Sequence, residues 1–301
     1  MNVCVLMAVY NGGEWLEQQL DSILKQTNVI LDIFISLDRS NDNSLLIIER
    51  YVELNANIHL LPSGDKYGSA GQNFFRLLKD VDFGRYDFIS FADQDDIWLE
   101  NKLEKSINLI HATDSDAYSG NVTAFWSSGR RQLVTKDHNQ ADFDYLFESA
   151  GPGCTFVISK ALCLDIQRDL TNKWSHVKSL WLHDWYCYSY ARSKGFKWII
   201  GKEPLMLYRQ HELNQVGANS GFKALVARAQ VVLSGDAFDK VLSQSDFIGL
   251  DAAPLKLLKE NTFISIFKLS FYSRRCRRSL RDAVLFYIAV NLLSLKRLIT
   301  K

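Results

Sequence analysis

The sequence predicts an α/β protein with a mostly parallel sheet flanked by helices and a C-terminal helical extension. Short apolar, strand-like segments alternate with helical patterns over roughly the first 110 residues, as they do in proteins with parallel sheets. Each of these apolar segments ends in a polar or glycine-containing turn. From Gly221 onward only helical spacing remains. We therefore expect one α/β domain over residues 1–220 and a basic, amphipathic helical region over residues 221–301.

The composition is that of a folded, globular protein. The 301 residues are 47% hydrophobic and 23% charged, and the four prolines argue against long disordered linkers. Five scattered cysteines without a CxxC pair indicate reduced thiols rather than a disulfide framework or a zinc site. The first apolar run, Val3–Val9, is short and lacks a basic leader, so we expect no signal peptide. These features predict a cytoplasmic protein.

The chain begins with a predicted buried strand, Val3–Val9, that ends at the turn Tyr10–Gly13. A helix is expected from about Glu14 to Gln26, because Leu16, Leu20, Ile23 and Leu24 share one helical face. A second strand, Leu31–Leu37, ends at Asp38–Asp42, and a second helix covers about Ser44–Leu54.

The next elements lead to an acidic stretch. We expect a strand at Ile58–Leu61, a glycine-containing loop with Gly68, and a helix at Phe74–Lys79. A fourth strand, Tyr86–Ala92, then delivers Asp93-Gln94-Asp95-Asp96, and a helical pattern begins at about Glu100.

Polar clusters follow four predicted strands of this sheet, at Tyr10–Gly13, Asp38–Asp42, Gly68–Asn73 and Asp93–Asp96. The carboxyl ends of parallel strands meet at one edge of a sheet, where such sheets bind ligands. Three carboxylates within four residues are what Mg²⁺ or Mn²⁺ requires, together with substrate phosphates. The alternative is an acidic surface turn in which Asp96 caps the following helix.

These residues resemble family 2 inverting glycosyltransferases with the GT-A fold, and most closely the bacterial rhamnosyltransferase-like members. The similar motifs occur in the expected order over about residues 1–217. They are Ala8-Val9-Tyr10-Asn11-Gly12, Ser36–Ser44, Asp93–Trp98, Gly153-Cys154-Thr155, Leu182-His183-Asp184-Trp185 and Tyr208-Arg209-Gln210-His211. The chain departs from the family pattern at Leu37 and Arg39, and at Glu212-Leu213-Asn214 after the last motif.

The resemblance implies a division of roles on the donor side. Asp95 and His211 would bind Mg²⁺ or Mn²⁺, although His211 could instead be a structural histidine. The nucleotide part of the donor would contact Ala8, Tyr10, Asp38, Gly68, Asp93 and Arg209. Tyr10 can stack on a base and Asp38 can accept a hydrogen bond from a pyrimidine imide, which favours uracil or thymine.

Asp184 is the predicted general base, since an inverting transfer needs one carboxylate that takes the proton of the attacking hydroxyl. The apolar setting of Trp181, Leu182 and Trp185 would raise the pKa of Asp184. The alternative is that Asp184 caps a helix running to about Lys194, with His183 as a packed neighbour.

The C-terminal region combines basic and apolar residues. Lys268–Lys301 holds nine Lys/Arg and one acidic residue. Helical spacing is expected over Phe222–Leu233, Pro254–Lys268 and Ser279–Leu298. We expect five arginines to contact an anionic membrane surface: Arg274, Arg275, Arg277, Arg278 and Arg281. Each would contribute about 1 kcal/mol to the free energy of membrane binding. The alternative is a helical cap packed on the domain; nucleic acid is not an expected partner, because the region is too aliphatic.

The expected function is a metal-dependent inverting glycosyltransferase. It would move a sugar, by resemblance L-rhamnose from dTDP-L-rhamnose, to a growing glycan on a lipid carrier at the inner face of the cell membrane. Two alternatives are a non-catalytic nucleotide-sugar-binding subunit of a glycan assembly complex and a nucleotidyltransferase. Against the nucleotidyltransferase, this chain shows no glycine-rich, basic loop near the N-terminus, and Asp184 would be left without a role.

Overall fold

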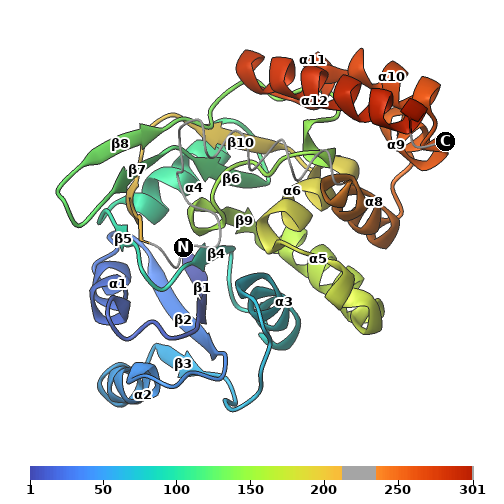
Figure 1. Cartoon of the computed structure of the whole chain (residues 1–301). Coiled ribbons are helices and arrows are strands. Elements are labelled where there is room, and N and C mark those ends of the chain that lie inside the picture. The colour runs from blue at the N-terminus through green and yellow to red at the C-terminus, as the bar shows by residue number, and fades with distance from the viewer. Residues whose placement is uncertain (212–234, 300–301) are drawn as a thin grey trace. The chain divides into compact units, whose positions relative to one another are not determined.

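The computed structural model describes residues 1–211 and 235–299, with the side chain of residue 299 excepted (Figure 1). The chain divides into two compact units. The first comprises Met1–Asp137, Ala150–Lys178 and Leu182–Gly217, and the second comprises His138–Ser149, Ser179–Trp181 and Ala218–Lys301. The predicted helical spacing at Phe222–Leu233 and the departure at Glu212–Asn214 lie outside the described residues.

The first unit is built on a seven-stranded sheet with the order β10-β6-β9-β4-β1-β2-β3. Only β9 runs antiparallel to its neighbours in this sheet, so the predicted mostly parallel sheet is confirmed. Its strands are β1 (Asn2–Val9), β2 (Ile30–Leu37), β3 (Ile58–Leu60), β4 (Phe88–Ala92), β6 (Ala117–Gly120), β9 (Val157–Ser159) and β10 (Trp198–Gly201).

The strand register brings the predicted polar clusters to one edge. In the two parallel pairs, Val9 lies opposite Leu37 and Met7 lies opposite Ala92. Tyr10, Asp38 and Asp93 are therefore the first residues beyond the carboxyl ends of three adjacent strands. This is the convergence that the alternation of strands and helices predicts.

Helices cover both faces of this sheet (Figure 1). The side chains of Val3, Val5, Met7 and Val9 on one face of β1 share a core with α1, α2 and α4, whereas α3 packs on β1 and β2 beside α5 and α6. This is the period-two alternation of a strand buried on both sides. The helices are α1 (Leu16–Leu24), α2 (Ser44–Leu54), α3 (Ala70–Asp80), α4 (Lys102–Ala112), α5 (Lys160–Asn172) and α6 (His183–Ser193).

A second sheet of four short strands, in the order β5-β11-β7-β8, adjoins the acidic turn. Its strands are β5 (Ile97–Trp98), β7 (Val122–Phe125), β8 (Arg131–Val134) and β11 (Met206–Arg209). β5 follows the acidic turn directly and pairs with β11, which carries Arg209. This pairing joins two motifs that lie far apart in the sequence.

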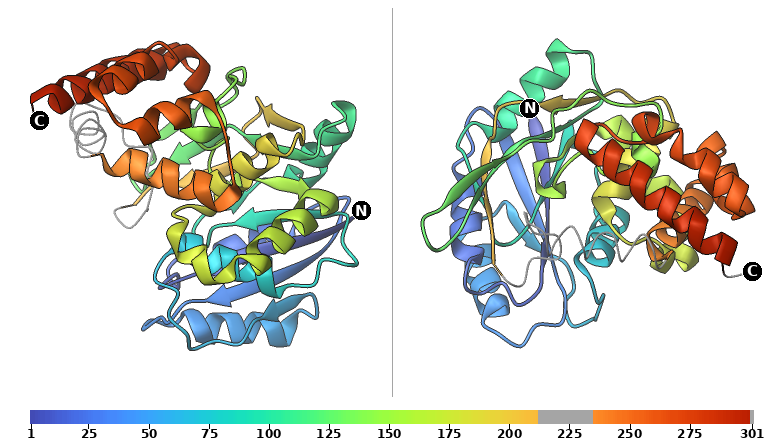
Figure 2. Two further views of the ribbon diagram at one scale, coloured as in Figure 1. Left: turned by 90° about the vertical axis from the view of Figure 1, so that its right-hand side faces the viewer. Right: turned by 45° about the horizontal axis from the view of Figure 1, so that its top comes forward.

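The second unit is helical, and the basic C-terminal region lies within it. They are α8 (Asp236–Ile248), α9 (Ala253–Glu260), α10 (Phe263–Ser270), α11 (Ser273–Cys276) and α12 (Leu280–Ile299), with the short 3-10 helix η1 (Asp144–Leu146). Figure 2 shows α10 and α12 side by side, and they pack on each other. In the described part of the chain, none of the helices is long and apolar enough to cross a membrane.

The single helix predicted over Pro254–Lys268 is wrong, because the chain breaks it at Asn261. That residue has a left-handed backbone with φ of 48°, and Thr262 starts a new helix through a capping box with Ser265. The helix predicted at Ser279–Leu298 is confirmed as α12.

Arginines of the basic region bind acidic residues within the second unit. Arg278 is buried and lies 3.3 Å from the carboxylate of Asp144, and Arg275 donates a hydrogen bond to Asp142. Arg277 donates to the carbonyl of Phe147. Three of the five arginines expected at a membrane are thus bound to the segment 142–148.

Candidate active site

The acidic turn is fastened to the first strand by Gln94. Its side chain accepts a hydrogen bond from the Tyr10 backbone N–H at 2.7 Å and donates one to the Tyr10 carbonyl at 3.0 Å. A Cβ atom at Gly12 would lie only 2.4 Å from Gln94 Oε1, so this approach requires glycine. Gln94 therefore fixes the carboxylates on either side of it against the Tyr10–Gly13 turn.

Asp95 is buried and contacts His211. His211 Nε2 lies 2.6 Å from Asp95 Oδ2, and the His211 ring stacks on Trp15 with centroids 4.1 Å apart. Arg209 donates from Nε to the Asp95 carbonyl at 2.7 Å, and its guanidinium lies over Phe125. The structure thus brings together Asp95, Arg209 and His211, as expected for one site.

Asp96 points inward and does not cap a helix. Helix α4 begins at Lys102 after Asn101, so the interpretation of Asp96 as a helix cap is wrong. Its Oδ1 accepts a hydrogen bond from the Arg209 backbone N–H at 3.0 Å. Its Oδ2 is buried and has no hydrogen-bond partner among residues 1–211 and 235–299.

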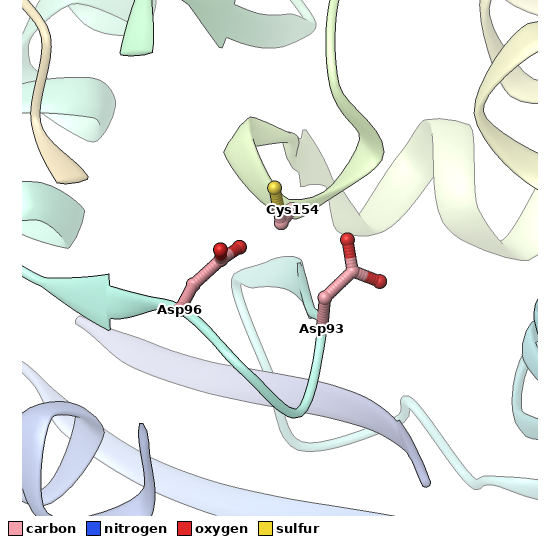
Figure 3. A group of neighbouring side chains, drawn as sticks. All are labelled: Asp93, Asp96 and Cys154. Carbon is pink, nitrogen blue, oxygen red and sulfur yellow. The ribbon is translucent and has the colours of Figure 1, made fainter. Parts of the chain in front are cut away.

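The side chains of Asp93, Asp96 and Cys154 converge beside the turn (Figure 3). Their ligand atoms lie within 4.8 Å of one another. Burial, and then the charges of Asp95 and Asp184, raise the pKa of Asp93 to about 7. Burial, and then the charges of Asp95 and Asp93, hold the pKa of Asp96 far above its ordinary range.

The residues of the acidic turn fit a divalent cation. They offer hard oxygen ligands from neighbouring carboxylates, one of them the unsatisfied Oδ2 of Asp96. Burial first, and neighbouring carboxylates second, raise the pKa values of Asp93 and Asp96, and a bound cation would favour their ionised forms. Asp95 and Asp93 would hold the cation, and its chemical contribution would be to neutralise diphosphate charge.

The predicted nucleotide residues lie along the same edge. Tyr10 is 57% exposed, so its ring is available to a ligand, whereas Ala8 is buried within β1. The buried carboxylate of Asp38 accepts hydrogen bonds from the backbone N–H groups of Arg39, Tyr67 and Gly68. Asp38 therefore anchors the loop that contains Gly68, and about one of its lone pairs stays available to a base.

Asp184 lies in the first turn of α6, near Asp93. Its Oδ1 accepts from the Trp185 N–H at 2.7 Å, and Leu182, not Asp184, is the N-cap residue. A Cβ atom at Gly153 would lie 3.1 Å from Asp184 Cβ and 2.6 Å from His183 Nε2. Gly153 thus lets the turn before β9 approach the predicted base closely.

His183 is a packed residue, as expected. It is buried and stacks on Phe74 with centroids 3.8 Å apart. Burial lowers the pKa of His183 to about 3, so the imidazole is too weakly basic to serve as a second base at neutral pH.

Two residues of this site have no role assigned from the sequence: Gln94, which lies between two aspartates, and Cys154, which is named only within the motif Gly153-Cys154-Thr155. Contacts with residues far along the chain, and burial, leave no pattern of spacing in the sequence. Only the position of Gln94 between two aspartates could have drawn attention to it.

Comparisons with known proteins agree with this geometry. A family model described as Glycosyl transferase family 2 matches residues 4–162. The dTDP-rhamnosyl transferase RfbG of Shigella flexneri is 41% identical over 288 residues, which are 95% of this chain and 100% of that protein.

Solved structures share the fold. TarS 1-349 of S. aureus in complex with UDP-GlcNAc has a TM-score of 0.54 at 14% identity, over 100% of this chain and 93% of that one. A mannosyltransferase of Pyrobaculum calidifontis in complex with GDP-Man and Mn²⁺ has a TM-score of 0.50 at 14% identity, over 98% of this chain and 84% of that one. The predicted GT-A fold is confirmed.

Proposed function

The chain belongs to glycosyltransferase family 2, and we propose that it transfers L-rhamnose from dTDP-L-rhamnose to a lipid-linked bacterial surface glycan, with inversion. Its membership makes it a glycosyltransferase that uses a nucleotide sugar. The choice of sugar is supported by the 41% identity to a dTDP-rhamnosyl transferase over nearly the whole chain. The observation that carries the proposal is the acidic turn, whose carboxylates lie at the sheet edge near Asp184.

The proposed reaction assigns metal binding to one set of side chains and proton transfer to another. Asp95, His211 and Asp93 would hold Mg²⁺ or Mn²⁺ against the diphosphate, and the cation would offset the charge of the leaving group. Arg209 lies beside this position and can pair with phosphate. Asp184 would take the proton of the acceptor hydroxyl as that oxygen attacks the anomeric carbon and the bond to the diphosphate breaks.

Replacement of Asp184 by Asn tests the base. We expect D184N to lose transfer by at least about a thousandfold, while its affinity for dTDP with Mn²⁺ stays within about twofold of wild type. Asp169→Asn is a matched control, because Asp169 lies on the neighbouring helix α5 and binds Lys173 and Tyr186 rather than the acidic turn. Wild-type turnover by D184N would refute the assignment.

The donor can be identified by binding. Thermal unfolding of the protein with Mn²⁺ and dTDP, UDP or GDP should show the largest stabilisation with dTDP, because a ligand that binds the folded state raises the melting temperature. A clear preference for UDP or GDP would refute dTDP-L-rhamnose as donor while leaving the glycosyltransferase intact.

We also propose that the second unit attaches the enzyme to the inner face of the cell membrane. Helices α10 and α12 expose large apolar side chains, as does Phe271 at the C-cap of α10, which is 65% exposed. The others are Ile264, Phe267, Leu280, Val284, Tyr287, Ile288, Leu292, Leu295 and Leu298. The exposed cations Lys268, Arg274, Arg281 and Lys296 belong to the same helices and their connection. Apolar side chains with cations beside them suit an anionic bilayer surface.

Flotation with vesicles of anionic phospholipid tests the attachment. Wild-type protein should float with the vesicles, and the double variant Phe271→Asp/Ile288→Asp should not. Leu133→Asp is the control, since Leu133 is an exposed apolar residue of the first unit. Equal flotation of all three proteins would argue against this surface.

A further inference from the structure

We propose that Arg39 and Arg76 are positioning residues of the donor site, which hold residues 62–68 as a preformed wall of the nucleobase site beside Asp38. These residues connect β3 to α3 and are called the nucleobase loop below. The inference rests on the proposed function, since it specifies how the same site recognises the base of the donor. In the sequence, Arg39 stands out only as a departure from the family pattern, and Arg76 does not stand out at all.

The nucleobase loop is attached to Asp38 through its backbone. The N–H groups of Tyr67 and Gly68 donate to the Asp38 carboxylate at 2.9 and 2.8 Å, and the Arg39 N–H donates to it at 2.8 Å. A carboxylate offers about four lone-pair sites, so about one remains, on Oδ2. The position of the loop therefore fixes the direction from which Asp38 can accept a hydrogen bond from a base.

Arg76 contacts this loop at both ends. It lies on α3 and is only 6% exposed. Its Nη2 donates to the carbonyl of Pro62 at 2.6 Å, and its guanidinium lies 5.0 Å from the centroid of the Tyr67 ring. A hydrogen bond from a charged donor is roughly twice as strong as a neutral one, and an aromatic face stabilises the cation further. One buried side chain thus restrains the loop at its first residue and near its last.

The same guanidinium is fixed to the main sheet. Its Nη1 donates to Ser36 Oγ at 2.9 Å, and that hydroxyl donates to the side chain of Asn73. Asn73 Nδ2 in turn donates to the carbonyls of Ser36 at 2.9 Å and Val9 at 3.4 Å. Buried networks whose members are hydrogen-bonded are rigid. Arg76 therefore holds the loop at a fixed position relative to the ends of β1 and β2, which carry the predicted nucleotide residues.

Arg39 holds the middle of the loop. Its Nε and Nη2 both donate to the carbonyl of Gly64, at 3.3 and 3.2 Å, and its backbone N–H donates to the carbonyl of Asp65 at 3.0 Å. Gly64 has a φ of 114°, a conformation that glycine adopts readily, so the loop bends where Arg39 binds it. Arg39 is exposed whereas Arg76 is buried, so removal of Arg39 releases the loop at little cost to the core.

Arg39→Ala and Arg76→Met each remove one attachment of the loop. Arg85→Ala is the control for the first, because Arg85 is an exposed arginine that binds Asp32. Gln167→Leu is the control for the second, because Gln167 donates to carbonyls at the end of α3, away from the loop. The measured quantities are the dissociation constants for dTDP and dGDP with Mn²⁺ by calorimetry, with melting temperatures to confirm folding. These two nucleotides share the deoxyribose diphosphate and differ only in the base.

We expect the wild-type protein to prefer dTDP. R39A and R76M should each bind dTDP about tenfold more weakly, as for the loss of about one hydrogen bond, and bind dGDP within about twofold of wild type. Both controls should bind both nucleotides as wild type does. R39A should keep the wild-type melting temperature, so it decides the matter even if R76M does not fold.

Wild-type affinity of R39A for dTDP would overturn the inference. So would an equal loss for dTDP and dGDP, because a merely structural role weakens both alike, and so would a wild-type protein without a preference for dTDP. A wild-type protein that binds none of dTDP, UDP and GDP with Mn²⁺ would instead refute the proposed function.

Discussion

Replacement of Gln94 by leucine should weaken donor binding as well as the fold. The change keeps the size of the side chain and removes both of its hydrogen bonds to the Tyr10 backbone. Those two bonds hold the acidic turn against the end of β1, and the tight approach of Gly12 leaves little room for another arrangement. Without them the carboxylates of the turn lose a fixed position relative to the nucleotide side.

The expected change in the donor KM follows from the number of hydrogen bonds that the substitution removes. A typical intramolecular hydrogen bond contributes about 1 kcal/mol net, so the two bonds are worth about 2 kcal/mol. At 1.36 kcal/mol for each factor of ten, this corresponds to a rise of about 30-fold in the KM for the donor. The rate at saturating donor should change much less, since the turn is ordered again in the bound state.

Steady-state transfer with Mn²⁺ and dTDP-L-rhamnose measures this effect. The matched control is Gln167→Leu, because Gln167 donates to the carbonyls of Leu78, Lys79 and Val81 at the end of α3. The control should lose a similar amount of stability and retain the wild-type KM. A Q94L enzyme with a KM within twofold of wild type would refute the role of Gln94.

Three further predictions concern other parts of the molecule. Gly12→Ala should raise the donor KM as Q94L does and add little in a Q94L background, because the new Cβ atom meets Gln94 Oε1; additive effects in steady-state kinetics would contradict this. The pKa of Asp93 is raised to about 7, above that of an unfolded carboxyl, so its contribution to the stability of the metal-free protein is present at low pH and lost as the pH rises through 7. Mn²⁺ should therefore raise the melting temperature more at pH 8 than at pH 6, and an equal shift would argue against Asp93 beside the metal. Arg278→Met should cost about 3–5 kcal/mol in chemical denaturation, because it leaves buried Asp144 without this cation, whereas Arg274→Ala at an exposed position should cost less than about 0.5 kcal/mol.

The main sheet could be predicted because its strands carry local signals. The strand at Val3–Val9 and the helix at Ser44–Leu54 match the structure within a residue, since an apolar run and a helical face leave periodic patterns. The second sheet could not be predicted in this way. Strands such as β5, with only the residues Ile97 and Trp98, are too short for any periodicity and exist through pairing with distant β11.

The residues of the candidate site differ in the same way: some carry a local signal in the sequence, and others depend on contacts with distant residues. Neighbouring carboxylates at a strand end predict the acidic turn as a metal site, whereas the roles of Asp95 and His211 within it follow from the family resemblance. Their contact spans 116 residues, a separation at which spacing in the sequence carries no information. Lys102 shows the same limit: in the sequence it is an ordinary lysine near the start of a helix, and only its burial, with 1% of its surface exposed, distinguishes it.

The arrangement of charge at this edge connects the proposed metal site with the proposed base. Asp93 and Asp184 interact electrostatically, and the charge of Asp184 contributes to the raised pKa of Asp93. Because such an interaction is mutual, a negatively charged Asp93 also favours the protonated form of Asp184. A protonated Asp184 could not take the proton of an acceptor hydroxyl.

A divalent cation that arrives with the diphosphate would change this balance. It would neutralise charge at Asp93 and Asp95, and it would thereby reduce the repulsion between Asp93 and Asp184. In this view the metal and the donor together prepare the base, although Asp184 itself is not a metal ligand. The pH dependence of transfer by the wild-type enzyme checks the argument: the apparent pKa of the proposed base should be higher in kcat/KM, which reports the free enzyme, than in kcat at saturating donor.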